Sequence, residues 1–450
     1  CYGIGICKVR TNSMPADALK YLLKAEVKYG QEEDFLLALT RAYLYNHDFE
    51  NARATLSKAR TKSKNVIELD AVGAYIDNAE RLVKSPLNVT FVNLGKNINS
   101  DMDDITPMLS ADNSILVYST NRKFDTEISE YSWDVLSANS ESGDFKKNKA
   151  VTAVNSIENE MVAGWSNSGD ELFFMFDGYG AEHDLMSTSF EKGAFKGKNM
   201  LSQTVNTKLF EQGAYATQNG DTLFFSSEGL EGFGGLDLYY SVKLPNGDWS
   251  TPENLGDSIN TLYDETYPTL SADGRKLYFC SNGLNSMGGY DIFVCDIDTD
   301  GLKLGKPQNI GYPLNDCYDN LTISYTVAYV SAIKPDSYGY SDVYRVVFND
   351  KDPMVRMYLV KLVTQQGEQT ADFGETEKNL KVTVFTKNKT VYGTYNYNPT
   401  SSQVPVALLP GTYTLEIEGE TIEPFSMKIN VPNAPGKPIE NVKAVLKVKK

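Results

Sequence analysis

Histidine is almost absent from this 450-residue sequence, which contains only His47 and His183. A zinc site built from three histidines is therefore excluded unless carboxylates supply the missing ligands. A serine hydrolase needs a histidine base beside an exposed nucleophile. The nearest nucleophile motif, "GWSNSG" at 164–169, lacks the second glycine at the required spacing. We expect no enzyme activity, no metal centre and no cofactor.

Cysteine is scarce, and none of the five cysteines forms a C-x-x-C pair. This pattern excludes a zinc ribbon and a thioredoxin-type redox site. Cys280 and Cys295 end two neighbouring predicted strands. We expect a buried, reduced pair there, with a disulfide as the alternative.

Long hydrophobic runs and clusters of positive charge are also missing. No apolar stretch approaches the roughly 18 residues that cross a membrane as a helix. Lysine and arginine number 43 against 59 aspartate and glutamate residues, which gives a net charge of −16. Nucleic-acid binding needs clustered basic residues at the phosphates. We therefore expect no nucleic-acid partner and no membrane-spanning helix.

The first residue is cysteine, as in a bacterial lipoprotein after its signal peptide has been removed. We expect residues 1–14 to be a tether that carries a lipid on Cys1. An arbitrary boundary of the sequence is the alternative.

Residues 15–86 have the apolar periodicity of helices. Small residues at Ala42, Ala52 and Ala59, with the turn "NHDFENA", resemble a tetratricopeptide (TPR) helix pair. A further helix is predicted at about 66–83. This segment either presents a groove to a partner peptide or packs as a cap on the next domain.

Residues 88–350 repeat a short pattern in which asparagine is followed, five residues later, by an acid or an amide. The five copies are "NSDMDD" (99–104), "NSIENE" (155–160), "NTKLFE" (206–211), "NTLYDE" (260–265) and "NDCYDN" (315–320). Each copy precedes a short apolar strand. Later in each unit an aspartate opens a further strand, and Asp134, Asp184, Asp237, Asp291 and Asp342 are 50, 53, 54 and 51 residues apart. A period near 50 with about four strands per unit predicts a β-propeller.

The phase of the repeat predicts how the propeller closes. "NLGKNIN" (93–99) recurs as "NLGDSIN" (254–260) and "NIGYPLN" (309–315), yet its first copy stands before any complete unit. We therefore expect residues 89–95 to form the outer strand of the fifth blade, which removes both free sheet edges. A degenerate sixth blade is the alternative. Residues 355–450 change to longer alternating strands and predict an antiparallel β-sandwich. The fold class is mainly β, with an N-terminal helical segment.

The unit at 254–293 resembles the TolB-type, WD40-like propeller repeat of bacterial envelope proteins. The segment with "LLPGTYTLEIEGE" (408–420) is similar to the regulatory sandwich found beside carboxypeptidase catalytic domains. Helices, propeller and sandwich in this order resemble Bacteroidota envelope lipoproteins of the PorE-like type, which act in type IX secretion and gliding.

This resemblance implies a lipid-anchored outer-membrane protein, with the periplasmic face favoured, that works beside an outer-membrane barrel complex. PorE-like proteins also carry an OmpA-like domain, which this sequence lacks, so we expect scaffolding rather than peptidoglycan anchoring. The short Bacteroidota O-glycosylation pattern matches at Ser258; a second match, Asp221-Thr222-Leu223, falls in a predicted strand.

Four acids of the repeat form the sharpest candidate site: Asp104, Glu160, Glu211 and Glu265, with Asn320 at the fifth position. Equivalent blades would place them in one ring at a mouth of the central channel, where they could bind a cation or a basic partner. The alternative is that each acid accepts backbone hydrogen bonds at the start of its strand. "DIDTDG" (296–301) begins like a calcium loop, but Pro307 replaces the glutamate expected at position twelve.

We therefore expect a non-enzymatic scaffold for protein interactions in the envelope. The alternative is a glycan- or cell-wall-binding lipoprotein that uses loop aromatics such as Tyr179, Phe233 and Tyr290.

Overall fold

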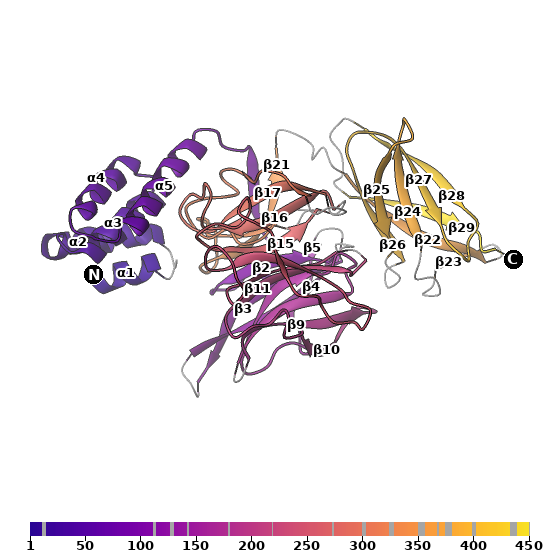
Figure 1. Cartoon of the computed structure of the whole chain (residues 1–450), viewed down its shortest axis with the longest axis horizontal. Coiled ribbons are helices and arrows are strands. Elements are labelled where there is room, and N and C mark those ends of the chain that lie inside the picture. The colour runs from indigo at the N-terminus through magenta and orange to yellow at the C-terminus, as the bar shows by residue number, and fades with distance from the viewer. Residues whose placement is uncertain are drawn as a thin grey trace.

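The structure is a computed structural model of the chain. It describes residues 1–449 except for 11–14, 111–113, 127–129, 142–143, 179–180, 218, 272–273, 299–302, 324–327, 350–355, 367–368, 374–379, 398–401 and 433–438. Helices lie at the N-terminal end, a large group of sheets lies in the middle, and further strands lie at the C-terminal end (Figure 1). Within the described residues, no helix combines the length and the apolar character that crossing a bilayer requires.

Five helices form the N-terminal part of the described chain, and side chains cap the starts of two of them. They are α1 (Tyr2–Arg10), α2 (Pro15–Tyr29), α3 (Glu33–Tyr45), α4 (Phe49–Arg60) and α5 (Val66–Leu82). The Asp48 side chain accepts from the N–H of Asn51 at the start of α4, and Asn65 caps α5 in the same way. The small residues noted in the sequence, Ala42, Ala52 and Ala59, are completely buried.

Helix α1 is a departure from the sequence analysis, which treats residues 1–14 as a tether. The Tyr2 ring stacks on Tyr29 with 4.3 Å between centroids, and Val9 shares a core with Leu22 and Phe35. Glycines at positions 3 and 5 weaken the helical signal in the sequence. Packing against α2 and α3, rather than the intrinsic helix propensity of its residues, stabilises α1.

Five antiparallel sheets follow within the described residues. Sheet 1 contains β2 (Asp104–Leu109), β3 (Ile115–Asp125), β4 (Glu130–Glu141), β5 (Asp144–Phe145) and β6 (Lys149–Ala150). Sheet 2 contains β7 (Asn159–Trp165), β8 (Glu171–Gly178), β9 (Ala181–Glu191) and β10 (Ala194–Met200). Sheet 3 contains β11 (Glu211–Ala216), β12 (Thr222–Ser227), β13 (Asp237–Val242) and β14 (Glu253–Asn254). Sheet 4 contains β15 (Glu265–Leu270), β16 (Lys276–Ser281), β17 (Asp291–Asp298), β18 (Lys303–Leu304) and β19 (Gln308–Asn309). Sheet 5 contains β20 (Tyr329–Ala332), β21 (Asp342–Phe348) and β1 (Val89–Asn93).

The first strand of this region completes its last sheet. β1 pairs antiparallel with β21, with Val89 opposite Phe348 and Asn93 opposite Tyr344. Chain segments about 250 residues apart therefore share one ladder. The pairing removes an edge at each end of the region.

The sheets meet through their first strands. β7 contacts β2 and β11, β11 contacts β15, and β2 contacts β20. Gly213 has a positive φ of 67°, and a Cβ there would lie 2.6 Å from the backbone nitrogen of Tyr267 on the next sheet. Glycine is needed at this point because the neighbouring backbones approach too closely for a side chain. The first strands therefore surround a common centre, as in a β-propeller.

The C-terminal strands form two sheets that share one core. The first contains β22 (Arg356–Gln366), β23 (Gln369–Asp372), β26 (Gln403–Leu408) and β29 (Ile439–Leu446). The second contains β24 (Lys381–Thr386), β25 (Val391–Asn396), β27 (Gly411–Glu418) and β28 (Phe425–Val431). Val360, Val382 and Leu415, from both sheets, are completely buried in that core.

One pairing there corrects the sequence analysis, which predicts only antiparallel strands. β29 runs parallel to β22, with Met357 opposite Ile439 and Thr364 opposite Leu446. Alternation of apolar residues identifies a strand but not its direction, because both ladders have the same two-residue period.

Candidate functional site

The four acids proposed as a ring are completely buried where their strands begin. Asp104, Glu160, Glu211 and Glu265 are 0% exposed. Each carboxylate accepts from the backbone N–H four residues earlier, with the donors Ser100, Ser156, Thr207 and Thr261 at 2.6, 3.0, 3.0 and 2.7 Å. The hydroxyl groups of the same four residues donate to these carboxylates as well. Each acid thus closes its own connecting loop, which favours the structural alternative over a binding ring.

The acids also face the preceding sheet. The Glu265 N–H donates to the carbonyl of Leu236, just before β13, and the Asp104 N–H donates to that of Ser341, just before β21. Among the residues that the structure describes, no three acidic, histidine or cysteine side chains are grouped to hold a metal ion. The geometry therefore places these acids at the junctions between sheets.

The repeated asparagine forms hydrogen bonds across the same junctions between sheets. Asn260 accepts from the backbone N–H of Leu238 at 2.8 Å and donates to its carbonyl at 3.0 Å. The same two bonds join Asn99 to Val343, Asn155 to Val135, Asn206 to Leu185 and Asn315 to Ile292. Asn155, Asn206, Asn260 and Asn315 fix their connecting loops to the third strand of the sheet before, and Asn99 fixes its loop to β21, the middle strand of sheet 5. The motif that marks the repeat is accordingly the one that joins the sheets.

The five repeats differ in how they treat the buried charge. Arg122 lies 2.5 Å from Asp104, and Lys198 lies 3.0 Å from Glu160. In the fifth repeat the acid stands four positions earlier, as Asp316, with Lys334 at 3.1 Å.

In sheets 3 and 4 a serine stands where the cation would be. Ser227 donates to Glu211 at 2.7 Å, and Ser281 donates to Glu265 at 2.6 Å. Burial raises the pKa of Glu265 to about 7, and it also raises the pKa of Glu211. No basic side chain among the described residues pairs with Glu211 or Glu265, so these two buried carboxyl groups resist ionisation.

The helices pack on the loops of sheets 4 and 5. Met287 and Cys317 are buried in the same core as residues of α3, α4 and α5. The Tyr75 hydroxyl donates to the carbonyl of Asn282 at 2.6 Å, and the Tyr45 ring stacks on Tyr318 with 5.4 Å between centroids. The helical segment therefore uses one apolar surface as a cap, one of the two roles that its sequence allows.

The loops equivalent to the covered one are open to solvent. Cys317 and Tyr318 occupy the second and third positions after the asparagine of the fifth repeat. At those positions the second, third and fourth repeats carry Ile157, Leu209 and Leu262, which are 73%, 53% and 81% exposed. We call these three residues the exposed loop row. Its sequence signal is an apolar residue recurring in an otherwise polar loop, which the sequence analysis did not use.

The modification candidates occupy the surface. Cys1 is exposed, with a free thiol. Ser258 is exposed in the turn before Ile259 and lines a groove between the end of α5 and the loops of sheet 4. Thr222, in the second match to the glycosylation pattern, lies in β12.

The remaining candidates for chemistry have structural partners. Cys280 and Cys295 are free and buried, and the Cys280 thiol donates to the carbonyl of Leu321. His47 stacks on Phe49, and burial lowers its pKa. The Ser166 hydroxyl of the "GWSNSG" motif donates to Asp170.

Two further predictions involve the acidic turn and the loop aromatics. The acidic turn at 296–301 lies partly outside the described residues, as does Tyr179 of the glycan alternative. Phe233 is 47% exposed. Tyr290 is half-buried, and its hydroxyl donates to Asp264.

Comparison with known proteins identifies no family. No protein-family model matches the sequence, and no curated protein matches it. Solved structures that are similar in part include TolB from Acinetobacter baumannii, with 14% identity, 62% of this chain and 70% of that chain covered, and a TM-score of 0.34.

Two enzymes are similar to a comparable degree. An endo-arabinase from Bacteroides thetaiotaomicron has 14% identity, 58% and 98% coverage of the two chains and a TM-score of 0.37. A gluconolactonase from Xanthomonas campestris has 12% identity, 59% and 95% coverage and a TM-score of 0.31. At these values the matches carry no argument about function, and the architecture rests on the strand pairing described above.

Proposed function

We propose that this protein is a non-enzymatic scaffold that binds partner proteins in a bacterial envelope. Sheets 1 to 5 are taken as the blades of a five-bladed propeller, the helices as a TPR-like cap, and the two C-terminal sheets as a carboxypeptidase-regulatory-like sandwich. The observation that carries the proposal is the exposed loop row: Ile157, Leu209 and Leu262 are exposed at repeat positions equivalent to those that the helices cover in the fifth repeat.

The covered loop indicates what kind of partner fits. At the fifth repeat, aromatic and aliphatic side chains from helices fill the space over Cys317 and Tyr318. The same positions elsewhere offer isolated apolar side chains in an acidic protein with a net charge of −16. An amphipathic helix whose apolar stripe is flanked by lysine or arginine would match both properties.

Charge reversal in the exposed loop row tests this proposal. The tagged protein is recovered from native membranes in mild detergent, as wild type and as Leu262→Glu. A partner that is lost from the variant binds through the row. Leu244→Glu is the matched control, because Leu244 is an exposed leucine (42%) in a loop outside the row. Identical partners for all three proteins would reject the row as a binding surface.

The envelope location belongs to the same proposal: an outer-membrane lipoprotein, on the periplasmic face, next to a barrel complex of the type IX secretion and gliding kind. Mass analysis of the N-terminal peptide from native membranes tests it. A diacylglyceryl or triacyl mass on Cys1 is expected, and an unmodified Cys1 would contradict the lipid anchor. The same digest reports whether Ser258 carries a glycan.

A further inference from the structure

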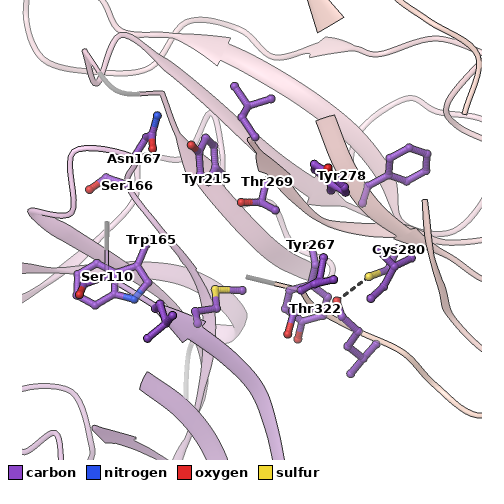
Figure 2. A pocket seen from close by; sticks show the side chains of 17 residues that line it. Ser110, Trp165, Ser166, Asn167, Tyr215, Tyr267, Thr269, Tyr278, Cys280 and Thr322 are labelled. Carbon is purple, nitrogen blue, oxygen red and sulfur yellow. Dashed lines mark hydrogen bonds between the residues drawn. The ribbon is translucent and has the colours of Figure 1, made fainter. Parts of the chain in front are cut away.

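A cavity lies at the centre of the ring of sheets, away from the exposed loop row. Residues from β2, β7, β11 and β15, from β16 and β17 of sheet 4 and from the segment 321–323 line it, and its volume is about 90 Å³. The lining includes Trp165, Tyr215, Tyr267, Tyr278 and Thr322. In Figure 2, Trp165 and Thr322 lie on opposite sides of the view, with Tyr215 between them.

Three polar atoms of this lining have no hydrogen-bond partner within the described part of the chain. They are Nε1 of Trp165, the hydroxyl of Tyr215 and Oγ1 of Thr322. Their residues are only 5%, 5% and 6% exposed. Buried polar groups are almost always satisfied, so three unsatisfied groups around one cavity call for a molecule that satisfies them.

The repeat itself does not require these polar atoms. At the position of Trp165 the other described repeats carry Leu109, Ala216 and Leu270. The position of Tyr215 is occupied by Met108 and Gly164 in the two preceding repeats. Residues that serve the fold recur in this protein, as the asparagines do, whereas the side chains of Trp165 and Tyr215 occur once at their positions among the described repeats.

The chemistry of the lining limits the ligand. None of the described residues that line the cavity is charged, and a charged ligand would stay uncompensated among them. Trp165 is only a donor, whereas the hydroxyls of Tyr215 and Thr322 donate or accept. The volume has room for roughly six to nine water-sized positions.

We propose that this cavity binds one uncharged, hydroxyl-bearing small molecule of the size of a single sugar ring. Trp165 donates to a ligand oxygen, and the hydroxyls of Tyr215 and Thr322 bond its hydroxyl groups. The rings of Tyr267 and Tyr278 supply apolar surface for its C–H faces.

Nuclear magnetic resonance of the tryptophan side chains tests the proposal. Protein with ¹⁵N-labelled tryptophan gives indole signals from Trp133, Trp165 and Trp249, and Trp165→Phe identifies the signal of Trp165 by its loss. The probes are glucose, galactose, mannose, N-acetylglucosamine and glycerol up to tens of millimolar, the range of weak small-ligand affinities. We expect at least one probe to shift the Trp165 signal saturably while the Trp133 and Trp249 signals stay in place.

Variants connect that shift to the cavity. Tyr215→Phe and Thr322→Val each remove one hydroxyl, and each should weaken binding about ten-fold. Tyr240→Phe is the matched control because its hydroxyl bonds Glu253 outside the cavity, and it should bind as the wild type does. A Trp165 signal that no probe shifts, or affinities unchanged in both cavity variants, would overturn the proposal and leave water as the occupant. Neither outcome bears on the exposed loop row.

Discussion

The same carboxyl site occurs in two electrostatic settings within one molecule. In sheets 1 and 2 a basic side chain accompanies the buried acid, as Lys198 accompanies Glu160. In sheets 3 and 4 a serine takes that place, as Ser281 does for Glu265. The backbone geometry around the acid is the same in both. The hydrogen bonds that the acid accepts are therefore common to these repeats. Whether a cation neutralises the acid differs from one sheet to the next.

Breaking a cation-paired site should have the largest effect. Arg122→Met leaves Asp104 completely buried without its cation and should lower the free energy of unfolding by about 4 kcal/mol. Chemical denaturation monitored by tryptophan fluorescence measures this loss. All three tryptophans lie between residues 133 and 249, so the signal reports unfolding of the region that forms sheets 1 to 5.

The control for this loss is a surface ion pair. Arg53 pairs with Asp77 at 2.7 Å and with Glu80 at 2.6 Å, and each of these side chains is about one third exposed or more. Arg53→Met should therefore cost less than about 1 kcal/mol. Equal losses for the two arginine variants would show that Asp104 does not depend on Arg122.

The pH dependence should separate the two settings. The pKa of Glu265 is about 7 in the folded protein, against about 4.3 in an unfolded chain. The folded protein holds this proton more tightly than the unfolded chain does. The contribution of Glu265 to the free energy of unfolding is therefore most favourable below about pH 4.3, and it is lost as the pH rises through about 7. Glu265→Gln cannot ionise and should gain about 3 kcal/mol relative to the wild type between pH 4 and pH 8.

Urea denaturation at several pH values measures that difference. Glu160→Gln is the comparison variant, because it removes the partner of Lys198 and should lose stability at pH 8. A gain of the same sign in both glutamine variants would mean that the two settings are electrostatically alike.

A change at the shared asparagine should affect both settings equally. Asn99→Ala and Asn260→Ala each leave a backbone N–H and a carbonyl without their partner, and each removes the same further bond to an asparagine six residues earlier. We expect each to cost about 2 kcal/mol, measured in the same denaturation experiment. A clear difference between the two losses would show that the sheets are not equivalent at their junctions.

The smallest effect is expected at the exposed loop row. Ile157 belongs to a cation-paired repeat and Leu262 to an uncompensated one, and both are largely exposed. Replacement of either by glutamate should change stability by less than about 0.5 kcal/mol. Thermal unfolding tests this, and a loss well beyond that value would mean that the row packs within the protein rather than serving a partner.

Much of the fold follows from local chemistry in the sequence. The asparagine, the acid or amide five positions on and the aspartate before a later strand recur because the junctions use the same kinds of hydrogen bond. The apolar runs between them predicted the strands, and the small residues at Ala42, Ala52 and Ala59 predicted close helix packing. Helix α1 was missed, because its stability comes from contact with Tyr29 and Phe35 rather than from its own residues.

The partners of the four acids could not be predicted from the sequence. Equal spacing correctly grouped Asp104, Glu160, Glu211 and Glu265 as equivalent residues. It did not show which groups surround each carboxylate in the folded protein. Arg122 and Lys198 lie 18 and 38 residues beyond their acids, so no local pattern links them. The sequence therefore left a binding ring and a structural role open for the four acids, with recurrence in every repeat favouring the structural role, and the hydrogen bonds of the structure support that role.

The sequence by itself determined the repeat, its period and the types of element, because these depend on neighbours within a few residues. Tertiary structure alone decided the rest. It selected which buried acids meet a cation, laid β29 parallel to β22 and placed the helices over one connecting loop while leaving three others exposed. It also brought Trp165, Tyr215 and Thr322 around one cavity. Each of these outcomes depends on contacts between residues far apart in the chain, and only the packed fold determines such contacts.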